Sequence, residues 1–303
     1  MAMNVAIDAV VCLLLVSAAV VGLVTVEQSP PAGPDRADAV ADALATTTAQ
    51  VDYSLAPGVR GLEDADHRDA DGGSISPDSP ELDRITHGSL AGLLARAATS
   101  TSGVAAAGRD SDPRASPLTQ ARTDFRRGVR DAVRARTGAT VRVDAVWQPY
   151  PRAPVGGAVG VGPEPPADDI HAATLTIPTG VESVAASEAS DFETLGTAVA
   201  ERTVRVLVPP GRARVTLRSE DPAAALVRHR YARLDAKTNA SLAEPLATED
   251  TDAANARVAD ALAPRMTADL RRRYDTPEAA AKSVSVSSVR LVVRTWAAPG
   301  GDR

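Results

Sequence analysis

The sequence predicts an α+β fold in which one N-terminal transmembrane helix precedes a soluble domain of mostly antiparallel strands covered by Ala-rich helices. Three observations predict it. An unbroken apolar run occupies residues 5–26. Several later stretches place apolar residues three or four positions apart, as a helix with one buried side does. Others alternate apolar and polar residues, which is typical of half-buried strands.

The apolar run predicts a membrane anchor, because a helix of this length rises about 33 Å and a hydrocarbon core is ~30 Å thick. A cleaved signal peptide and a buried core helix stay open as alternatives. No Lys or Arg precedes the run, and Glu27, Asp38 and Asp42 outnumber Arg36 after it. Since basic residues mark the cytoplasmic side, we expect a short cytoplasmic N-terminus and an extracellular domain.

Two polar or reactive residues lie within the run. Asp8 either sits at the headgroup level, where its cost is small, or pairs with the α-amino group of a neighbouring chain, as the acid near the start of a pilin helix does. The basic-Gly cleavage signal that precedes pilin helices is missing. Cys12 is the single cysteine, so no disulfide can form within the chain. We take Asp8 as a candidate partner-binding residue.

The chain is expected to divide into four regions. These are the anchor at 1–27, a Pro/Gly stalk at 28–34, a mainly helical region at 35–136 with an acidic loop at 57–84, and an α+β domain at 137–303.

Local patterns predict the elements within these regions. Helices are expected at residues 35–50, 89–98, 118–136, 189–201, 222–237 and 249–274. Pro264 should kink or split the last of them. Strands are expected at residues 51–55, 141–147, 171–177 and 284–296, with a hairpin over 203–218. The glycines of 155–162 lead into a Pro-rich run rather than a helix, so they predict the tip of a wide hairpin and not a phosphate loop.

Composition limits the classes of partner. The chain has 303 residues and a net charge of −6, which argues against a nucleic-acid partner. Of 33 Lys and Arg residues only Lys237 and Lys282 are lysine, while Asp and Thr are abundant. This usage is typical of a GC-rich, salt-adapted organism.

The motifs of catalysis and metal binding are absent from the sequence. The four histidines are scattered, and neither an HExxH, a CxxC nor a G-x-S-x-G motif occurs. The acidic loop does not match an EF-hand, because Pro80 stands where the twelfth-position Glu belongs. We therefore expect no enzyme, no catalytic residue, no cofactor and no metal.

One basic cluster remains as a candidate contact. Arg228, Arg230 and Arg233 surround Tyr231 and could bind phosphate or an acidic protein surface. The equally weighted alternative is an ordinary solvated helix face. The similar cluster at 271–274 is better explained by the helix dipole, which favours cations in a last turn.

Three short motifs carry a resemblance. The runs at 146–151, 161–166 and 172–178, with the anchor's Ile-Asp-Ala-Val start and the 46–55 stretch, are similar to uncharacterised haloarchaeal single-pass membrane proteins. Genes of that group tend to lie beside archaeal pilus or type II/IV-like secretion ATPases. The resemblance implies a role in surface assembly and carries no catalytic residues. Trp147 and Tyr150, which lie in the first run, join the candidate partner-binding residues.

These observations lead to one expected function and two alternatives. We expect a non-enzymatic, membrane-anchored accessory protein of an archaeal pilus or secretion apparatus. Its partners would be the bilayer, through residues 5–26, and other envelope or pilus proteins. A ligand- or ion-sensing ectodomain would need a concave pocket with convergent polar groups. An envelope hydrolase would need clustered acids or histidines with perturbed pKa values in a cleft.

Overall fold

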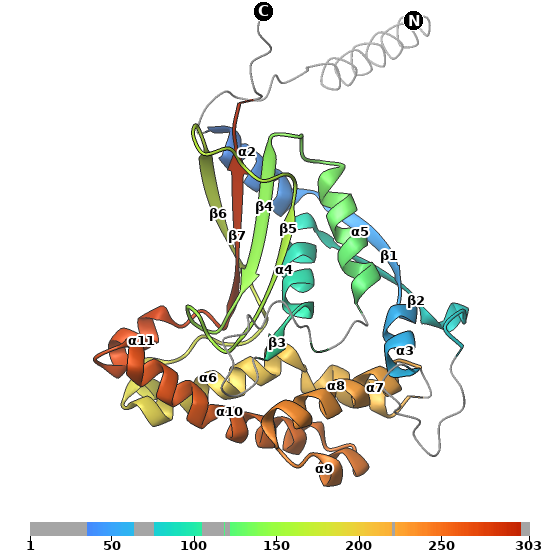
Figure 1. Ribbon diagram of the computed structural model, residues 1–303, viewed down its shortest axis with the longest axis vertical. Helices are drawn as coiled ribbons and strands as arrows, with labels where there is room; N and C mark the ends of the chain where they lie inside the picture. The colour runs from blue at the N-terminus through green and yellow to red at the C-terminus, as the bar shows by residue number, and fades with distance from the viewer. Residues whose placement is uncertain (1–34, 64–75, 105–117, 119–121, 220–221, 298–303) are drawn as a thin grey trace, which may run out of the picture.

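The computed structural model describes residues 35–63, 76–104, 118, 122–219 and 222–297. Two antiparallel sheets and a set of helices make up this part of the chain, which confirms the α+β class (Figure 1). The predicted acid Asp8 and Cys12 lie outside the described residues, as do the stalk and part of the acidic loop.

A five-stranded antiparallel sheet forms the centre of the molecule. Its strand order is β3-β5-β4-β7-β6. The strands are β3 (Gly103–Val104), β4 (Val141–Trp147), β5 (Val155–Val161), β6 (His171–Pro178) and β7 (Ser288–Thr295). Alternate residues of β4 and β7 are buried, so one face of the sheet meets the core, as the alternation in the sequence predicts.

Two helices cover the buried face of this sheet. They are α2 (Asp35–Thr46) and α4 (Leu90–Ser100), both in contact with the sheet. α4 begins where the Ser89 hydroxyl accepts a hydrogen bond from the Gly92 amide at 3.1 Å. Gly157 lets β5 approach this helix, because a Cβ there would lie 2.2 Å from the Ala98 carbonyl oxygen.

A two-stranded sheet extends from this centre. It pairs β1 (Thr48–Ser54) with β2 (Asp83–Ser89) in a register that matches Thr48 with Ser89. The flanking elements are α3 (Ala56–Glu63), the 3₁₀ turn η1 (Pro80–Leu82) and α5 (Thr123–Arg134), which packs along β1.

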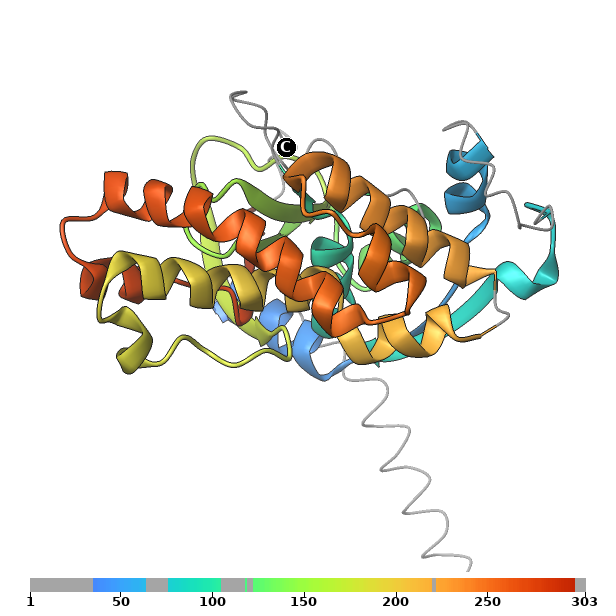
Figure 2. The ribbon, with the colours of Figure 1, turned by 90° about the horizontal axis from the view of Figure 1, so that it is seen from below.

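The remaining helices form a layer at one end of the five-stranded sheet (Figure 1). They are η2 (Ala186–Ala189), α6 (Phe192–Leu207), α7 (Pro210–Leu217), α8 (Ala223–Thr238), α9 (Ala243–Ala247), α10 (Thr251–Arg273) and α11 (Pro277–Ser283). Seen from below, α6 and α10 lie side by side (Figure 2).

Several predicted elements differ from the structure, among them the acidic loop at 57–84, whose described parts include most of α3 and all of η1. The expected hairpin over 203–218 is helical, forming the end of α6 and all of α7. The glycine-rich stretch 155–162 is not a hairpin tip, because most of it is strand β5. Pro264 lies within α10 without dividing it. The strands expected at 141–147 and 171–177 are confirmed.

The predicted transmembrane helix is corrected by the structure. In the described ranges no helix combines the length and the apolar character needed to span a bilayer. The predicted span, residues 5–26, lies outside those ranges.

One hydrophobic core joins the two regions that the sequence predicts to be separate. Its buried side chains run from Ala37 in α2 to Val293 in β7. A second, smaller core lies under α3, where Leu55, Val59, Leu82 and Leu226 are buried together.

Candidate functional site

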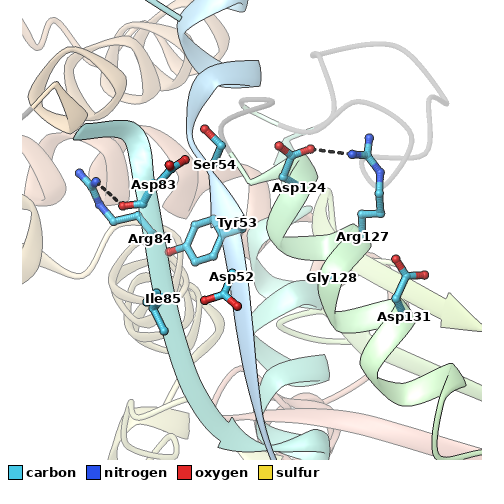
Figure 3. A pocket seen from close by; sticks show the side chains of 10 residues that line it. All are labelled: Asp52, Tyr53, Ser54, Asp83, Arg84, Ile85, Asp124, Arg127, Gly128 and Asp131. Carbon is cyan, nitrogen blue, oxygen red and sulfur yellow. Dashed lines mark hydrogen bonds and ion pairs between the residues drawn. The ribbon is translucent and has the colours of Figure 1, made fainter. Parts of the chain in front are cut away.

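The described part of the chain has a hollow of about 560 Å³ between the β1–β2 pair and α5, which we call the β1–β2 hollow. Figure 3 shows three adjacent residues from each strand and four from α5 around it. Its lining residues are Asp52, Tyr53, Ser54, Asp83, Arg84, Ile85, Asp124, Arg127, Gly128 and Asp131.

Packing of α5 against β1 forms one wall of the hollow. Phe125, Val129 and Val133 are buried on one side of the helix, which leaves Arg127 and Asp131 on another. Gly128 faces β1, and a Cβ there would lie 2.6 Å from Val51 Cγ1. A larger residue at Gly128 would therefore push the helix away from the strand.

The charge of the lining is mainly negative, with four aspartates against two arginines. Arg127 Nη1 forms an ion pair with Asp124 Oδ1 at 2.9 Å. Arg84 Nη1 donates to the backbone oxygen of Asp83 at 2.9 Å and also to that of Glu81. Asp52 accepts hydrogen bonds from the Gln50 amide at 3.0 and 3.3 Å. Carboxylates in this arrangement favour cationic side chains of a ligand or partner.

An exposed aliphatic side chain lies among these charges. Ile85 on β2 is 64% exposed, and the only other large hydrophobic side chain so exposed in the described residues is Val215 on α7. Ile85 shares its face of β2 with Asp83 and His87, since alternate residues of a strand point the same way. A single apolar residue on an otherwise polar face was the sequence signal for this site, and sequence reasoning missed it.

Trp147 and Tyr150, two of the predicted partner-binding residues, are instead fully buried. Trp147 Nε1 donates to the Val286 carbonyl oxygen at 3.1 Å. Burial and the negative charge of Asp269 raise the pKa of the Tyr150 hydroxyl above its usual value. Both side chains hold the β4–β5 loop against the core, so they offer no surface to a partner.

The predicted arginines on α8 point in different directions. Arg228 and Arg233 are exposed, whereas Arg230 is only partly exposed and its Nε atom is buried. The three arginines therefore do not share one exposed face. None of them lines the β1–β2 hollow.

The comparisons with known proteins give a family. Residues 7–296 match the model of a family described as "Family of unknown function (DUF7284)". The chain belongs to this family. Neither a curated protein nor a solved structure matches it. The haloarchaeal and pilus-associated resemblance stays a prediction.

This DUF7284 chain carries a second charged surface on the open face of its five-stranded sheet. Asp144 on β4 lies between two arginines, with Arg142 Nε at 2.9 Å from Oδ1 and Arg294 Nη1 at 2.7 Å from Oδ2. The hydrogen bond to Asp144 is the main reason that the pKa of Arg142 is raised. Because these charges neutralise one another across neighbouring strands, the network stabilises the sheet and leaves little unpaired charge for a ligand.

Metal-binding side chains do not gather in the described part of this DUF7284 chain. There, no three or more His, Cys, Asp or Glu residues lie in an arrangement that could hold an ion.

Proposed function

We propose that this protein is a non-enzymatic accessory component of a cell-surface pilus or secretion apparatus, and that it binds another envelope protein at the β1–β2 hollow. The cell-surface role is supported by the resemblance to haloarchaeal proteins. The choice of site is supported by one observation, the exposure of Ile85 on β2 among carboxylates.

The hollow favours a partner segment that is extended, basic and partly apolar. β1 is the single strand neighbour of β2 in the described sheets, so the other edge of β2 can pair with an added strand. An apolar side chain of that strand would cover Ile85. Its Lys or Arg residues would meet Asp52 and Asp83, which share a face of the β1–β2 pair with Ile85, and this gives both attraction and register.

The test is recovery of the partner with and without Ile85. The tagged protein is purified from its native host, and co-purifying proteins are quantified by mass spectrometry. Ile85→Asp should lower recovery of the partner about tenfold or more, because the apolar side chain that the partner would cover is replaced by a charge. Val215→Asp is the matched control, since Val215 is 71% exposed and lies on α7, away from the hollow lining.

A photo-crosslinking amino acid at position 85 should capture the same protein, and one at position 215 should not. Equal recovery with both Asp variants, or crosslinks only from position 215, would reject the hollow as the binding site. The extracellular placement of the domain, ligand sensing and envelope hydrolysis stay predictions.

A further inference from the structure

Four arginines, each in or next to a different helix, form a group in which three lie within electrostatic range of Arg122. They are Arg96 of α4, Arg122 at the start of α5, Arg212 of α7 and Arg230 of α8. Arg96 and Arg212 each act on Arg122, and Arg122 acts on Arg230. We call this group the arginine cluster.

Aromatic rings hold two of these guanidinium groups in place. The Cζ atoms of Arg96 and Arg122 lie 5.7 and 5.9 Å from the centre of the Phe125 ring. That ring in turn packs on Tyr53, with ring centres 5.2 Å apart. Such contacts orient a guanidinium and attract its charge, but they do not neutralise it. Arg96 also donates to the Thr86 hydroxyl, which is uncharged.

The arginine cluster has no carboxylate partner in the part of the chain that the structure describes. Several other arginines on helices do have one: Arg202 pairs with Glu188 at 2.8 Å, and Arg273 with Asp269 at 3.0 Å. Within the cluster, Arg230 Nε is buried and makes no hydrogen bond. A buried donor without an acceptor is unfavourable, so a bound anion that accepts from Arg230 Nε would stabilise this site.

The pKa values agree with this geometry. Burial is the main cause that lowers the pKa of Arg230 to about 10, and the charge of Arg122 adds to it. Burial is also the main cause that lowers the pKa of Arg122. The neighbouring Tyr53 raises this pKa, and Arg212 and Arg96 lower it. A bound anion would favour the charged form of both arginines.

We propose that the arginine cluster binds a phosphate group. A guanidinium fork matches two oxygens of a phosphate, and a doubly charged anion neutralises Arg122 and Arg230 together, whereas one carboxylate would neutralise only one of them. Arg122 is also the N-cap residue of α5 and makes no side-chain capping bond. An anion close to this helix end would also be favoured by the helix dipole. The phosphate is either inorganic or the terminal group of a small phosphomonoester.

Titration of the full-length chain with inorganic phosphate tests the proposal. Calorimetry and thermal unfolding are recorded in chloride buffers of constant ionic strength, with acetate as the singly charged comparison and glycerol 3-phosphate as the ester. Phosphate should bind saturably and raise the melting temperature, and acetate should bind at least about tenfold more weakly. Tighter binding of glycerol 3-phosphate than of phosphate would identify an ester as the natural source.

Two double variants show where phosphate binds. Arg122→Gln combined with Arg230→Gln should weaken phosphate binding about tenfold or more, whereas Arg228→Gln combined with Arg233→Gln, on exposed positions of α8, should leave it unchanged. In phosphate-free buffer the first pair should melt no lower than the natural chain, because repulsion between the two arginines is removed.

Three results would overturn the proposal. They are a natural chain that binds no phosphate, one that binds acetate equally well, and a cluster variant that binds phosphate as tightly as the natural chain. The first two need no variant, so they decide the matter even if the paired cluster variant fails to fold. This site does not depend on the β1–β2 hollow, and Ile85→Asp should leave phosphate binding unchanged.

Discussion

Asp269 on α10 shows how single residues connect the helical layer to the sheet. Its carboxylate is almost completely buried and accepts from Arg272 at 2.6 Å and from Arg273 at 3.0 Å. Arg273 also donates to the backbone oxygens of Pro151 and Arg152, both at 3.0 Å. One carboxylate thus orients the arginine that fastens the β4–β5 loop to α10.

Asp269→Asn should lower the free energy of unfolding by about 1–3 kcal/mol, because the change removes a buried negative charge that two arginines share. Urea unfolding monitored by circular dichroism measures the loss. Asp131→Asn is the control, since the Asp131–Arg134 pair is mostly exposed and its loss should change stability by less than about 0.5 kcal/mol. Equal effects of the two substitutions would show that burial of Asp269 does not strengthen its pairing.

At the scale of elements, α6 begins with a charged cap. The Asp191 carboxylate accepts from the amides of Glu193 and Thr194, each at 2.8 Å. These bonds, with that to Thr194 as the largest cause, lower the pKa of Asp191. A lowered pKa in the folded state means that the carboxylate stabilises the fold above its ordinary pKa of about 3.9 and loses this effect as the pH falls through the lowered value.

Asp191→Ala should therefore lower the melting temperature at pH 7, and the difference from the natural chain should shrink below about pH 4. Thermal unfolding between pH 3 and 7 measures this change. Asp191→Asn keeps an uncharged cap, so its deficit at pH 7 should be smaller than that of the Ala variant. A deficit of the Ala variant that is independent of pH would mean that the charge of Asp191 does not contribute.

Strands with clear alternation were predictable because one face of the sheet meets the core and the other does not. β4 follows this rule at every residue. The stretch 203–208 misled the sequence analysis because its alternating valines look like a strand, whereas burial of Val199, Thr203, Val204 and Leu207 follows helical spacing. β5 was missed because its glycines were taken for a turn, although Gly157 serves the close approach of α4.

At the scale of the whole molecule, the hydrophobic core extends across the boundary predicted between residues 136 and 137. Leu90, Leu93 and Leu94 of α4 are buried in the same core as the strands that follow this boundary. Without α4 the inner face of the five-stranded sheet would be exposed to water. We therefore expect the two regions to fold together as one cooperative unit.

A fragment of residues 137–303 should not unfold cooperatively, whereas the full-length chain should show one transition in urea. Near-ultraviolet circular dichroism and binding of a hydrophobic dye measure the difference, and we expect the fragment to bind the dye. A fragment that unfolds in a sharp transition at the same urea concentration as the full chain would show that α2 and α4 add nothing to the core.

The β1–β2 hollow could not be predicted from the sequence, for a related reason. Its walls come from 52–54, 83–85 and 124–131, segments that are distant in the chain and meet only through the β1–β2 register and the contact of α5 with β1. Each segment alone is an ordinary polar surface. Of the arginine cluster, only Arg230 is among the partner-binding residues predicted from the sequence, because no periodicity reveals how the stretches that carry the four arginines lie in space.

The position of β7 has a consequence for biosynthesis. β7 is the last described strand in the chain, yet it lies inside the sheet, between β4 and β6. A ribosome releases the chain from its N-terminus, so β4 and β6 are made long before the strand that joins them. The helices of residues 192–283 must all emerge first. The sheet therefore closes only after β7 has left the ribosome, and until then β4 and β6 each present an edge that a chaperone or another chain can occupy.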